Sequence, residues 1–325
     1  TLGDVWDFPY MWRLNEKYLF KWLAYYNVDS EPINPNYLRE LASCCQIAST
    51  SHYGKEKMLE LDPSLDVDVV YHGHDPNIFR PSNLQESQRK IIDHTEKGSF
   101  VKVDCENKFV VFMDSQNSYR KNYPKAIEAF AKFAEDKNDV MLLIAADPKH
   151  QPDSFDLQYS LNNFHHVPSS KVKIVSTSIP NGAWLPDTLM AHLYNIANVY
   201  LSSARAEGFG LSVLQAYATK TIPIVPDYAS YRELVNDKTG FKIKIAAYDM
   251  SFMKTKAAIM DVDDCVQKLN LMYHDYKNGG ELAKKMGEAG AKVAAENTWI
   301  NSANAMLASI LKCTKKDKVV VHPQN

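Results

Sequence analysis

The chain has 325 residues, of which 45% are hydrophobic and 23% are charged, and its 37 basic and 39 acidic side chains leave a net charge of −2. This balance argues against a nucleic acid as partner, because nucleic-acid binders usually carry a basic surplus. No apolar run reaches the ~18–20 residues of a membrane helix. We therefore expect no integral membrane segment. Peripheral contact with a membrane is compatible with this composition.

The five cysteines show no zinc-ligand spacing and are typical of reduced, structural thiols. This usage favours a cytoplasmic location, and the chain does not open on a signal-peptide pattern. The length suggests about two domains. Because the chain starts with Thr1 instead of Met, inside what resembles the end of a strand, N-terminal sequence is expected to be missing.

The first third of the chain predicts a short alternation of helices and strands. In order, they are a helix over 33–45, a strand over 45–49, a helix over 51–61 and a strand over 67–71. Ser51 is a suitable N-cap for the second helix. The stretch Ser82–Glu106 is polar and lacks a clear apolar period, so we interpret it as a linker between two lobes.

A longer alternation begins at residue 108. Its strands are predicted at 108–113, 140–145, 172–175, 199–202 and 221–225. Its helices are predicted at 123–135, 188–197, 211–219, 231–235, 262–276, 281–296 and 298–311. Strands that alternate with helices predict a parallel sheet covered on both faces. The predicted fold class is therefore α/β, with two lobes joined near residues 82–107.

The loop after the strand 199–202 carries the clearest chemical pattern. Glu207 precedes the turn Gly208–Gly210, and a helix starts near Leu211. Glycines let the backbone approach a ligand closely, and a helix N-terminus favours a phosphate. A carboxylate such as Glu207 accepts hydrogen bonds from sugar hydroxyls, and Gln215 lies on the same side of the helix, where its amide can bind a ribose hydroxyl. The alternative interpretation is a glycine turn beside a solvated glutamate.

The segment ARAEGFGLSVLQAYATKTIPIVPDYASYRELV resembles the donor-site signature of family 4 of the retaining glycosyltransferases, which have the GT-B fold. In that family, two glutamates separated by seven residues surround the glycine turn. Here the second is replaced by Gln215, which keeps its hydrogen-bonding capacity and lacks the charge. The resemblance implies that Glu207 holds hydroxyls of the donor sugar, and that the backbone of Phe209, Gly210 and Leu211 meets the diphosphate and the sugar.

The segment MDSQNSYRKNYPKAIEAFAKF resembles a second donor element, in which an Arg and, five residues later, a Lys bind the diphosphate. Lys121 matches the Lys, Gln116 stands at the Arg position, and Arg120 could supply the missing charge. Cations of this kind stabilise a diphosphate leaving group. No metal motif stands out in a suitable loop, so no metal is expected. The alternative is that Arg120 and Lys121 are a solvated pair at the start of a helix.

Weaker matches complete the resemblance. The segment VDVVYHGHDPNIFRP resembles the element that closes the family's first lobe, and we favour a hinge-packing role for His72 and His74 over catalysis. Asp187 lies where family members contact the nucleobase, although a helix N-cap explains it equally well. Glu233 matches a recurrent family Glu and either faces the donor pocket or packs near it. Asp4 ends the first strand, where it either orients the acceptor hydroxyl or caps a turn.

The architecture that the resemblance implies has two Rossmann-like lobes with the donor between them. Residues 1–105 are then an incomplete acceptor-side domain, residues 106–297 are the donor-binding domain, and residues 298–325 cross back onto the first lobe.

The activity that the resemblance implies is transfer of a sugar from a nucleoside-diphosphate sugar to a hydroxyl of a glycan, glycolipid or protein. The transfer would retain anomeric configuration and use neither a metal nor another cofactor. Glu207, Lys121 and Asp4 are the expected catalytic residues. The alternatives are an epimerase or phosphorylase with the same fold, and a catalytically degenerate protein that binds sugar nucleotides.

Overall fold

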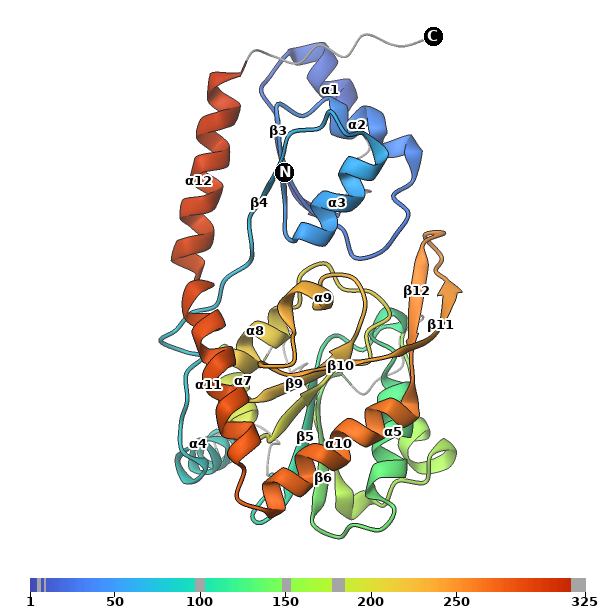
Figure 1. The fold of residues 1–325 in the computed structure, drawn as a ribbon, viewed down its shortest axis with the longest axis vertical. Helices are drawn as coiled ribbons and strands as arrows, with labels where there is room; N and C mark the ends of the chain where they lie inside the picture. Colours follow the sequence, from blue (N-terminus) through green and yellow to red (C-terminus); the bar gives the residue numbers. More distant parts are fainter. Residues whose placement is uncertain (5–6, 9, 97–102, 148–152, 177–184, 317–325) are drawn as a thin grey trace.

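The computed structural model describes residues 1–4, 7–8, 10–96, 103–147, 153–176 and 185–316, and within this part the side chains of residues 92–96 are not described. Two α/β lobes lie one above the other along the long axis (Figure 1). Each lobe is built on its own parallel sheet, which confirms the predicted fold class. No helix in the described part of the chain is long and apolar enough to cross a bilayer.

The first lobe contains a four-stranded parallel sheet in the order β1-β2-β3-β4. Its strands are β1 (Leu2–Asp4), β2 (Leu23–Asn27), β3 (Gln46–Ser49) and β4 (Val67–Val69). Its helices are α1 (Met11–Tyr18), α2 (Leu38–Ala42) and α3 (His52–Leu61). Because side chains alternate along a strand, Ala24 and Tyr26 pack toward these helices, whereas Tyr25 joins a small cluster with Met306 of the last helix.

The second lobe contains a six-stranded parallel sheet in the order β10-β9-β8-β5-β6-β7. Its strands are β5 (Phe109–Asp114), β6 (Val140–Ala145), β7 (Val172–Val175), β8 (Val199–Leu201), β9 (Ile222–Pro226) and β10 (Phe241–Ile243). Its helices are α5 (Tyr123–Ala134), α6 (Leu157–Tyr159), α7 (Asp187–Asn195), α8 (Leu211–Ala218), α9 (Tyr231–Leu234), α10 (Val262–Lys277) and α11 (Glu281–Glu296). Both faces of the sheet are buried: Phe112 packs on the face toward α7 and α8, and Phe109 and Val111 pack toward α5 and α10.

The chain crosses between the lobes twice, and the two crossing segments lie side by side. The backbone N–H of His74 donates to Asn297 at 3.1 Å, and that of Trp299 donates to His74 at 3.2 Å. A Cβ on Gly73 would lie 2.2 Å from the backbone of Thr298, so only glycine allows this approach. His74 is buried and its Nδ1 lies 2.9 Å from the Asn297 carbonyl, which agrees with the hinge-packing interpretation.

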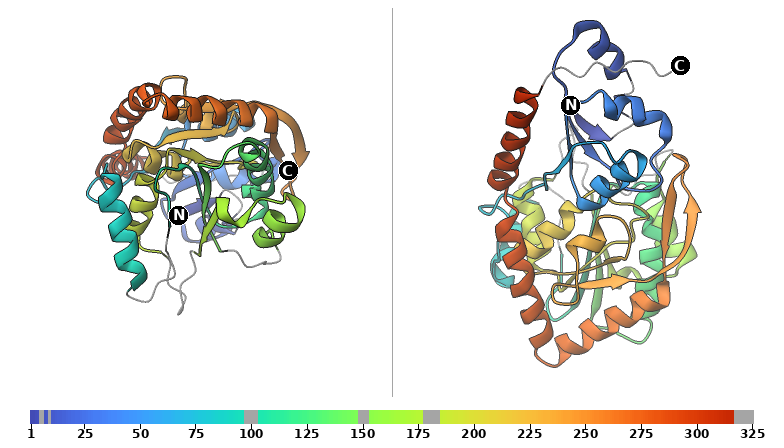
Figure 2. Two further views of the ribbon diagram at one scale, coloured as in Figure 1. Left: turned by 90° about the horizontal axis from the view of Figure 1, so that it is seen from below. Right: turned by 45° about the horizontal axis from the view of Figure 1, so that its top comes forward.

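The last helix, α12 (Trp299–Lys315), runs along one side of the first lobe (Figure 1, and the right-hand view of Figure 2). Its contacts are mainly with β3, and Ser309 donates to Asp68 at 2.7 Å. The predicted return of the C-terminal segment to the first lobe is therefore confirmed for this helix. Residues 317–325 of that segment lie outside the described residues.

The structure corrects the linker prediction. Much of the stretch from Ser82 to Glu106 is a helix, α4 (Leu84–Glu96), which packs against α7 of the second lobe. It buries Ser87 and Ile91 while Leu84 stays exposed. Only Leu84, Ile91 and Ile92 are apolar among its thirteen residues, so the sequence offers few positions from which a helical period could be recognised.

The sequence also left several elements without a prediction. These are β2, α1, β10 and the hairpin of β11 (Ile245–Met250) and β12 (Lys256–Met260). The hairpin rises from the second lobe beside the first lobe (Figure 1). It contacts the first lobe through Lys256, whose backbone N–H donates to Glu31 at 2.7 Å. Most of β11 is exposed, so its strand pattern lacks the alternation of a half-buried strand.

Candidate functional site

The predicted glycine turn lies between β8 and α8. Gly210 has a φ of 100°, in the left-handed region that favours glycine. A Cβ at this position would lie 2.9 Å from Cε1 of Tyr231 and 3.0 Å from Cδ1 of Leu234. α8 begins at Leu211, so its first N–H groups follow the turn directly and have no partner within the helix. The loop therefore presents a helix N-terminus next to Glu207.

The same loop touches the first lobe. The hydroxyl of Thr50 donates to the carbonyl of Gly208 at 3.1 Å, and a Cβ on Gly208 would lie 3.1 Å from Cβ of Asn27. Thr50 follows β3 and Asn27 ends β2, so both come from the carboxyl ends of first-lobe strands. In parallel sheets these ends are where ligands bind. The donor loop is thus at the boundary between the two lobes.

Glu207 is the centre of a charged network. Its side chain is 14% exposed, and its Oε2 lies 2.5 Å from Lys121 Nζ and 3.5 Å from Arg120 NH1. The hydroxyl of Tyr231 donates to the same oxygen at 3.4 Å. Burial by itself would raise the pKa of Glu207, but the two cations outweigh it and lower the pKa to about 2. Glu207 is therefore a carboxylate at any physiological pH.

Arg120 joins the two lobes electrostatically. It donates from NH1 to the carbonyl of Ala206 at 2.7 Å, and its Nε lies 3.8 Å from Oδ2 of Asp29 in the first lobe. Burial would lower the pKa of Arg120, but Glu207 and Asp29 raise it. The alternative that Arg120 and Lys121 are merely a solvated pair at a helix start is thus disfavoured, since both cations face Glu207.

Asp4 ends β1 and faces the same network. Burial and the negative charges of Asp29 and Asp7 raise its pKa to about 7, while Arg120 acts in the opposite direction. Its backbone N–H donates to Oδ2 of Asp7 at 2.7 Å. The turn after β1 is therefore closed by Asp7, which leaves the carboxyl group of Asp4 available on the first-lobe side of the site.

A pocket of about 300 Å³ lies beside this network in the second lobe. Four predicted donor residues line it: Gln116, Asp187, Leu211 and Gln215. The structure therefore brings together residues from the loop after β5, the start of α7 and the first turns of α8. Asp187 is the first residue of α7, and it is Pro186 that occupies the N-cap position, so the N-cap reading of Asp187 is wrong.

Asp114 also lines this pocket and was missed by the sequence analysis. It ends β5, is 8% exposed, and accepts a hydrogen bond from the hydroxyl of Tyr194 at 2.8 Å. Burial raises its pKa. The signal was present in the sequence, because a carboxylate directly after a buried strand is placed at the ligand-binding edge of the sheet.

Two predicted residues contact the first lobe instead of the pocket. Glu233 accepts hydrogen bonds from the backbone N–H of His52 at 3.0 Å and from the hydroxyl of Tyr71 at 3.1 Å. The ring of Phe209 is 3% exposed and lies 5.5 Å from the Tyr71 ring and 5.2 Å from the His72 ring. His72 is thus a packing partner of the donor loop, as the sequence analysis favoured.

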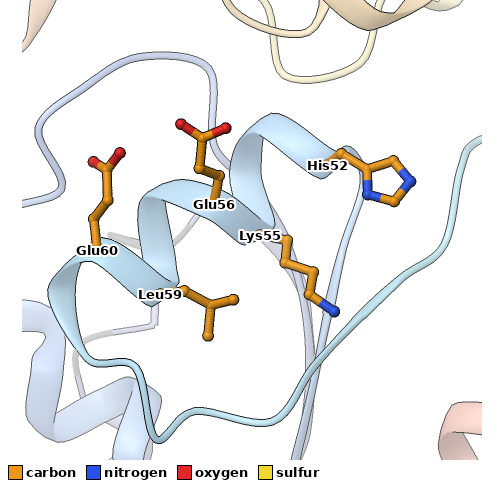
Figure 3. A pocket seen from close by; sticks show the side chains of 5 residues that line it. All are labelled: His52, Lys55, Glu56, Leu59 and Glu60. Carbon is orange, nitrogen blue, oxygen red and sulfur yellow. The ribbon is translucent and has the colours of Figure 1, made fainter.

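A second, shallow pocket lies on the outer surface of α3 (Figure 3). It is lined by His52, Lys55, Glu56, Leu59 and Glu60, all from this one helix. None of the predicted site residues is among them. The charged network at the lobe boundary and the pocket beside it contain nearly all the predicted site residues, and together they are therefore the candidate site.

The fold of the chain is similar to solved structures of other proteins. The structure is similar to sucrose-phosphate synthase from Thermosynechococcus elongatus, with a TM-score of 0.72 at 16% identity over 96% of this chain and 73% of that one. It is also similar to HepE from Anabaena, solved in complex with UDP and glucose, with a TM-score of 0.68 at 15% identity over 93% of this chain and 74% of that one. The predicted GT-B fold is confirmed by this likeness.

The second lobe carries a similarity to a known family. Residues 182–293 match the family model described as Glycosyl transferases group 1. The putative glycosyltransferase EpsD of Bacillus subtilis is 24% identical over 274 residues, which are 84% of this chain and 60% of that protein. The matched residues and the fold together make this chain similar to the glycosyl transferases of group 1. The chain spans about three fifths of the length of the curated relatives it matches.

Proposed function

We propose that this chain is a glycosyltransferase that moves a sugar from a nucleoside-diphosphate sugar to an acceptor hydroxyl, with retention of configuration and without a bound metal. The observation that carries the proposal is the pair of Lys121 and Glu207, 2.5 Å apart at the boundary of the lobes and next to the N-terminus of α8. An ammonium group beside a helix N-terminus suits a diphosphate, and a carboxylate suits sugar hydroxyls.

Donor binding divides between the network and the pocket. Lys121 and the first N–H groups of α8 would hold the diphosphate, and Glu207 would hold the sugar. Gln215 would bind a ribose hydroxyl within the pocket, with Gln116 and Asp187 on its walls. Because HepE was solved with UDP and glucose, UDP-glucose is the first donor to test, and a hexose is the expected sugar.

In the transfer step, the bond between the anomeric carbon and the diphosphate oxygen breaks, and its electron pair stays on the diphosphate. Lys121 stabilises the charge that develops there. The acceptor oxygen bonds to the anomeric carbon on the face that the diphosphate leaves, and its proton passes to an oxygen of the leaving phosphate. Asp4 would orient the acceptor hydroxyl from the first lobe. Placement of these groups contributes more to such a reaction than a strong base.

The test combines binding with turnover. Binding to the folded state stabilises a protein by about 2.7 kcal/mol at a ligand concentration a hundredfold above Kd. A panel of nucleoside-diphosphate sugars should therefore raise the melting temperature only for the correct donor. Release of the nucleoside diphosphate should then depend on an added acceptor, and Glu207→Ala should abolish it. Equal rates and donor affinities in wild type and Glu207→Ala would refute the site assignment.

A second candidate is a protein that binds sugar nucleotides without transferring them. It is favoured by Gln116 and Gln215, which stand where the family has an Arg and a Glu. This candidate predicts that a nucleoside-diphosphate sugar raises the melting temperature while no acceptor in a glycan, glycolipid and protein panel releases the nucleotide. Donor-dependent product formation would exclude it.

A cytoplasmic location, suggested by cysteine usage, agrees with five buried thiols that form no disulfide.

A further inference from the structure

Glu233 connects the second lobe to the start of a first-lobe helix. Its Oε2 accepts the N–H of His52, the first residue of α3, at 3.0 Å. The first N–H groups of a helix have no partner within the helix, and the helix dipole favours a negative charge at that end. Ser51 caps the N–H of Gly54 from within the first lobe. The N–H of His52 is therefore satisfied by a carboxylate from the other lobe.

Tyr71 makes the second half of the connection. Its hydroxyl donates to the same Oε2 of Glu233 at 3.1 Å. Its ring lies 5.5 Å from the ring of Phe209, in the centre of the donor loop. One carboxylate thus holds two first-lobe groups that are distant in sequence, and one of these packs directly on the loop next to Glu207.

The short helix that carries Glu233 also contacts the donor loop. The hydroxyl of Tyr231 donates to Oε2 of Glu207 at 3.4 Å, and that of Ser230 donates to the Glu207 carbonyl at 2.7 Å. This helix, α9, is only four residues long. Any movement that separates Glu233 from His52 would therefore shift the groups that orient Glu207.

We propose that Glu233 is a positioning residue that latches the two lobes together and thereby seats the donor loop, instead of binding the donor itself. Only the predicted effect of the latch on donor binding rests on the proposed function. Burial raises the pKa of Glu233, and its Oε1 is buried without a hydrogen-bond partner. A state in which the lobes are apart and the Glu233 carboxylate is hydrated therefore competes with the latched state. Closure of the two lobes can then respond to a ligand.

Two measurements test the latch without any substrate. In Glu233→Ala, the backbone amide of His52 should exchange its hydrogen at least about tenfold faster, which is the loss expected for a hydrogen bond to a charged group. Small-angle scattering should show a larger radius of gyration than for wild type. Glu233→Gln keeps an acceptor oxygen and should restore both values. Unchanged exchange and unchanged scattering in Glu233→Ala would overturn the latch.

A third measurement links the latch to the donor site. Apparent affinity falls in proportion to the population of the competent state, so the Kd of UDP should rise about tenfold in Glu233→Ala and recover in Glu233→Gln. In the transfer assay, KM for the donor should change more than kcat. A loss of UDP binding with normal exchange and scattering would instead show that Glu233 contacts the donor. If wild type binds no nucleoside diphosphate, the proposed function fails, while the first two measurements still decide the latch.

Two control variants separate the latch from general effects. Glu56→Gln removes an exposed carboxylate from the outer surface of the same helix (Figure 3) and should leave the His52 amide, the radius of gyration and the UDP affinity unchanged. Tyr71→Phe removes one of the two hydrogen bonds to Glu233 and keeps the ring against Phe209. It should give an intermediate effect. A change in Glu56→Gln equal to that in Glu233→Ala would contradict the assignment to Glu233.

Discussion

The two lobes contribute to the site in different ways. The second lobe supplies charges that are close together in sequence, since Arg120 and Lys121 are adjacent and Glu207 is followed at once by its glycine turn. The first lobe supplies single groups from separate strand ends, such as Asp4, Thr50 and Tyr71. Under the proposed function, the second lobe would hold the chemistry of donor binding, and the first lobe would orient and cover it.

The largest effect on this difference between the lobes is expected when the carboxylate of Glu207 is removed. Glu207→Ala should lower the transfer rate by about a hundredfold or more, as expected when a charge-stabilising group is lost from a preorganised site. It also removes the carboxylate that pairs with Lys121, whose side chain is 15% exposed, and with the half-buried Arg120. Steady-state kinetics with donor and acceptor measure the loss.

The second lobe offers a matched control for that variant. Asp264 lies on α10, far from the donor loop, and is also buried. Its Oδ2 lies 2.5 Å from Nζ of Lys268. Asp264→Asn should lower the free energy of unfolding and leave kcat/KM unchanged. Equal kinetic losses in Asp264→Asn and Glu207→Ala would mean that both act through stability and that the second lobe holds no special site.

The glycine turn provides the next test. Gly210→Ala places a side chain in the left-handed region, which costs ~1–2 kcal/mol, and adds a contact of 2.9 Å with Tyr231. We expect a lower free energy of unfolding together with weaker UDP binding, measured by urea denaturation and calorimetry. Gly279 is the control, because it has a similar φ of 99° but no atom within 4 Å of an added Cβ. Gly279→Ala should cost ~1 kcal/mol and leave UDP binding intact. Equal costs for the two variants would contradict the packing argument.

The contribution of Asp4 in the first lobe can be measured from the pH dependence of the free energy of unfolding. The pKa of Asp4 in the folded state, about 7, lies above its value of about 4 in an unfolded chain. The fold therefore favours the protonated form, and the stability from this group is lost as pH rises through 7. Asp4→Asn should flatten the decline in the free energy of unfolding between about pH 4 and pH 7.

The same variant tests the role of Asp4 in transfer. The ionised form should orient the acceptor, so the wild-type rate should rise as pH passes through about 7. Asp4→Asn should be about tenfold slower at pH 8, the size expected for one hydrogen bond to a charged group. An unchanged pH profile would remove Asp4 from the site and leave the first lobe with a covering role only.

The smallest effect is expected at Gln215. Gln215→Glu introduces the family's second carboxylate into the pocket that Asp114 and Asp187 also line. A charged acceptor strengthens a hydrogen bond to ribose, but the two neighbouring carboxylates oppose a third, so UDP affinity should change by no more than about threefold. Calorimetry with UDP measures the change. A hundredfold gain in UDP affinity would show that the native Gln215, in place of the family's Glu, is what limits donor binding.

Much of the second lobe could be predicted because its elements are locally encoded. The run Val140–Ala145 and the helix Glu281–Glu296 lie where the hydrophobic pattern places them. The pocket residues Gln116 and Gln215 could be assigned from their spacing to matched motifs. In the first lobe, β1 has three residues and α1 has eight. Elements this short carry too few side chains for a periodic pattern to emerge.

The sequence by itself determined the α/β class, the order of most second-lobe strands and helices, and the place of the glycine turn after Glu207, because strand and helix periodicity and glycine turns are properties of neighbouring residues. Only the tertiary structure decided that Asp29 pairs with Arg120, that Asp114 faces the pocket and that Glu233 reaches His52. Two of these contacts join residues that are 91 and 181 positions apart, and the third depends on which loops meet at a sheet edge. Local pattern has no information about such distances, since they are set by how two separately folded sheets close on each other.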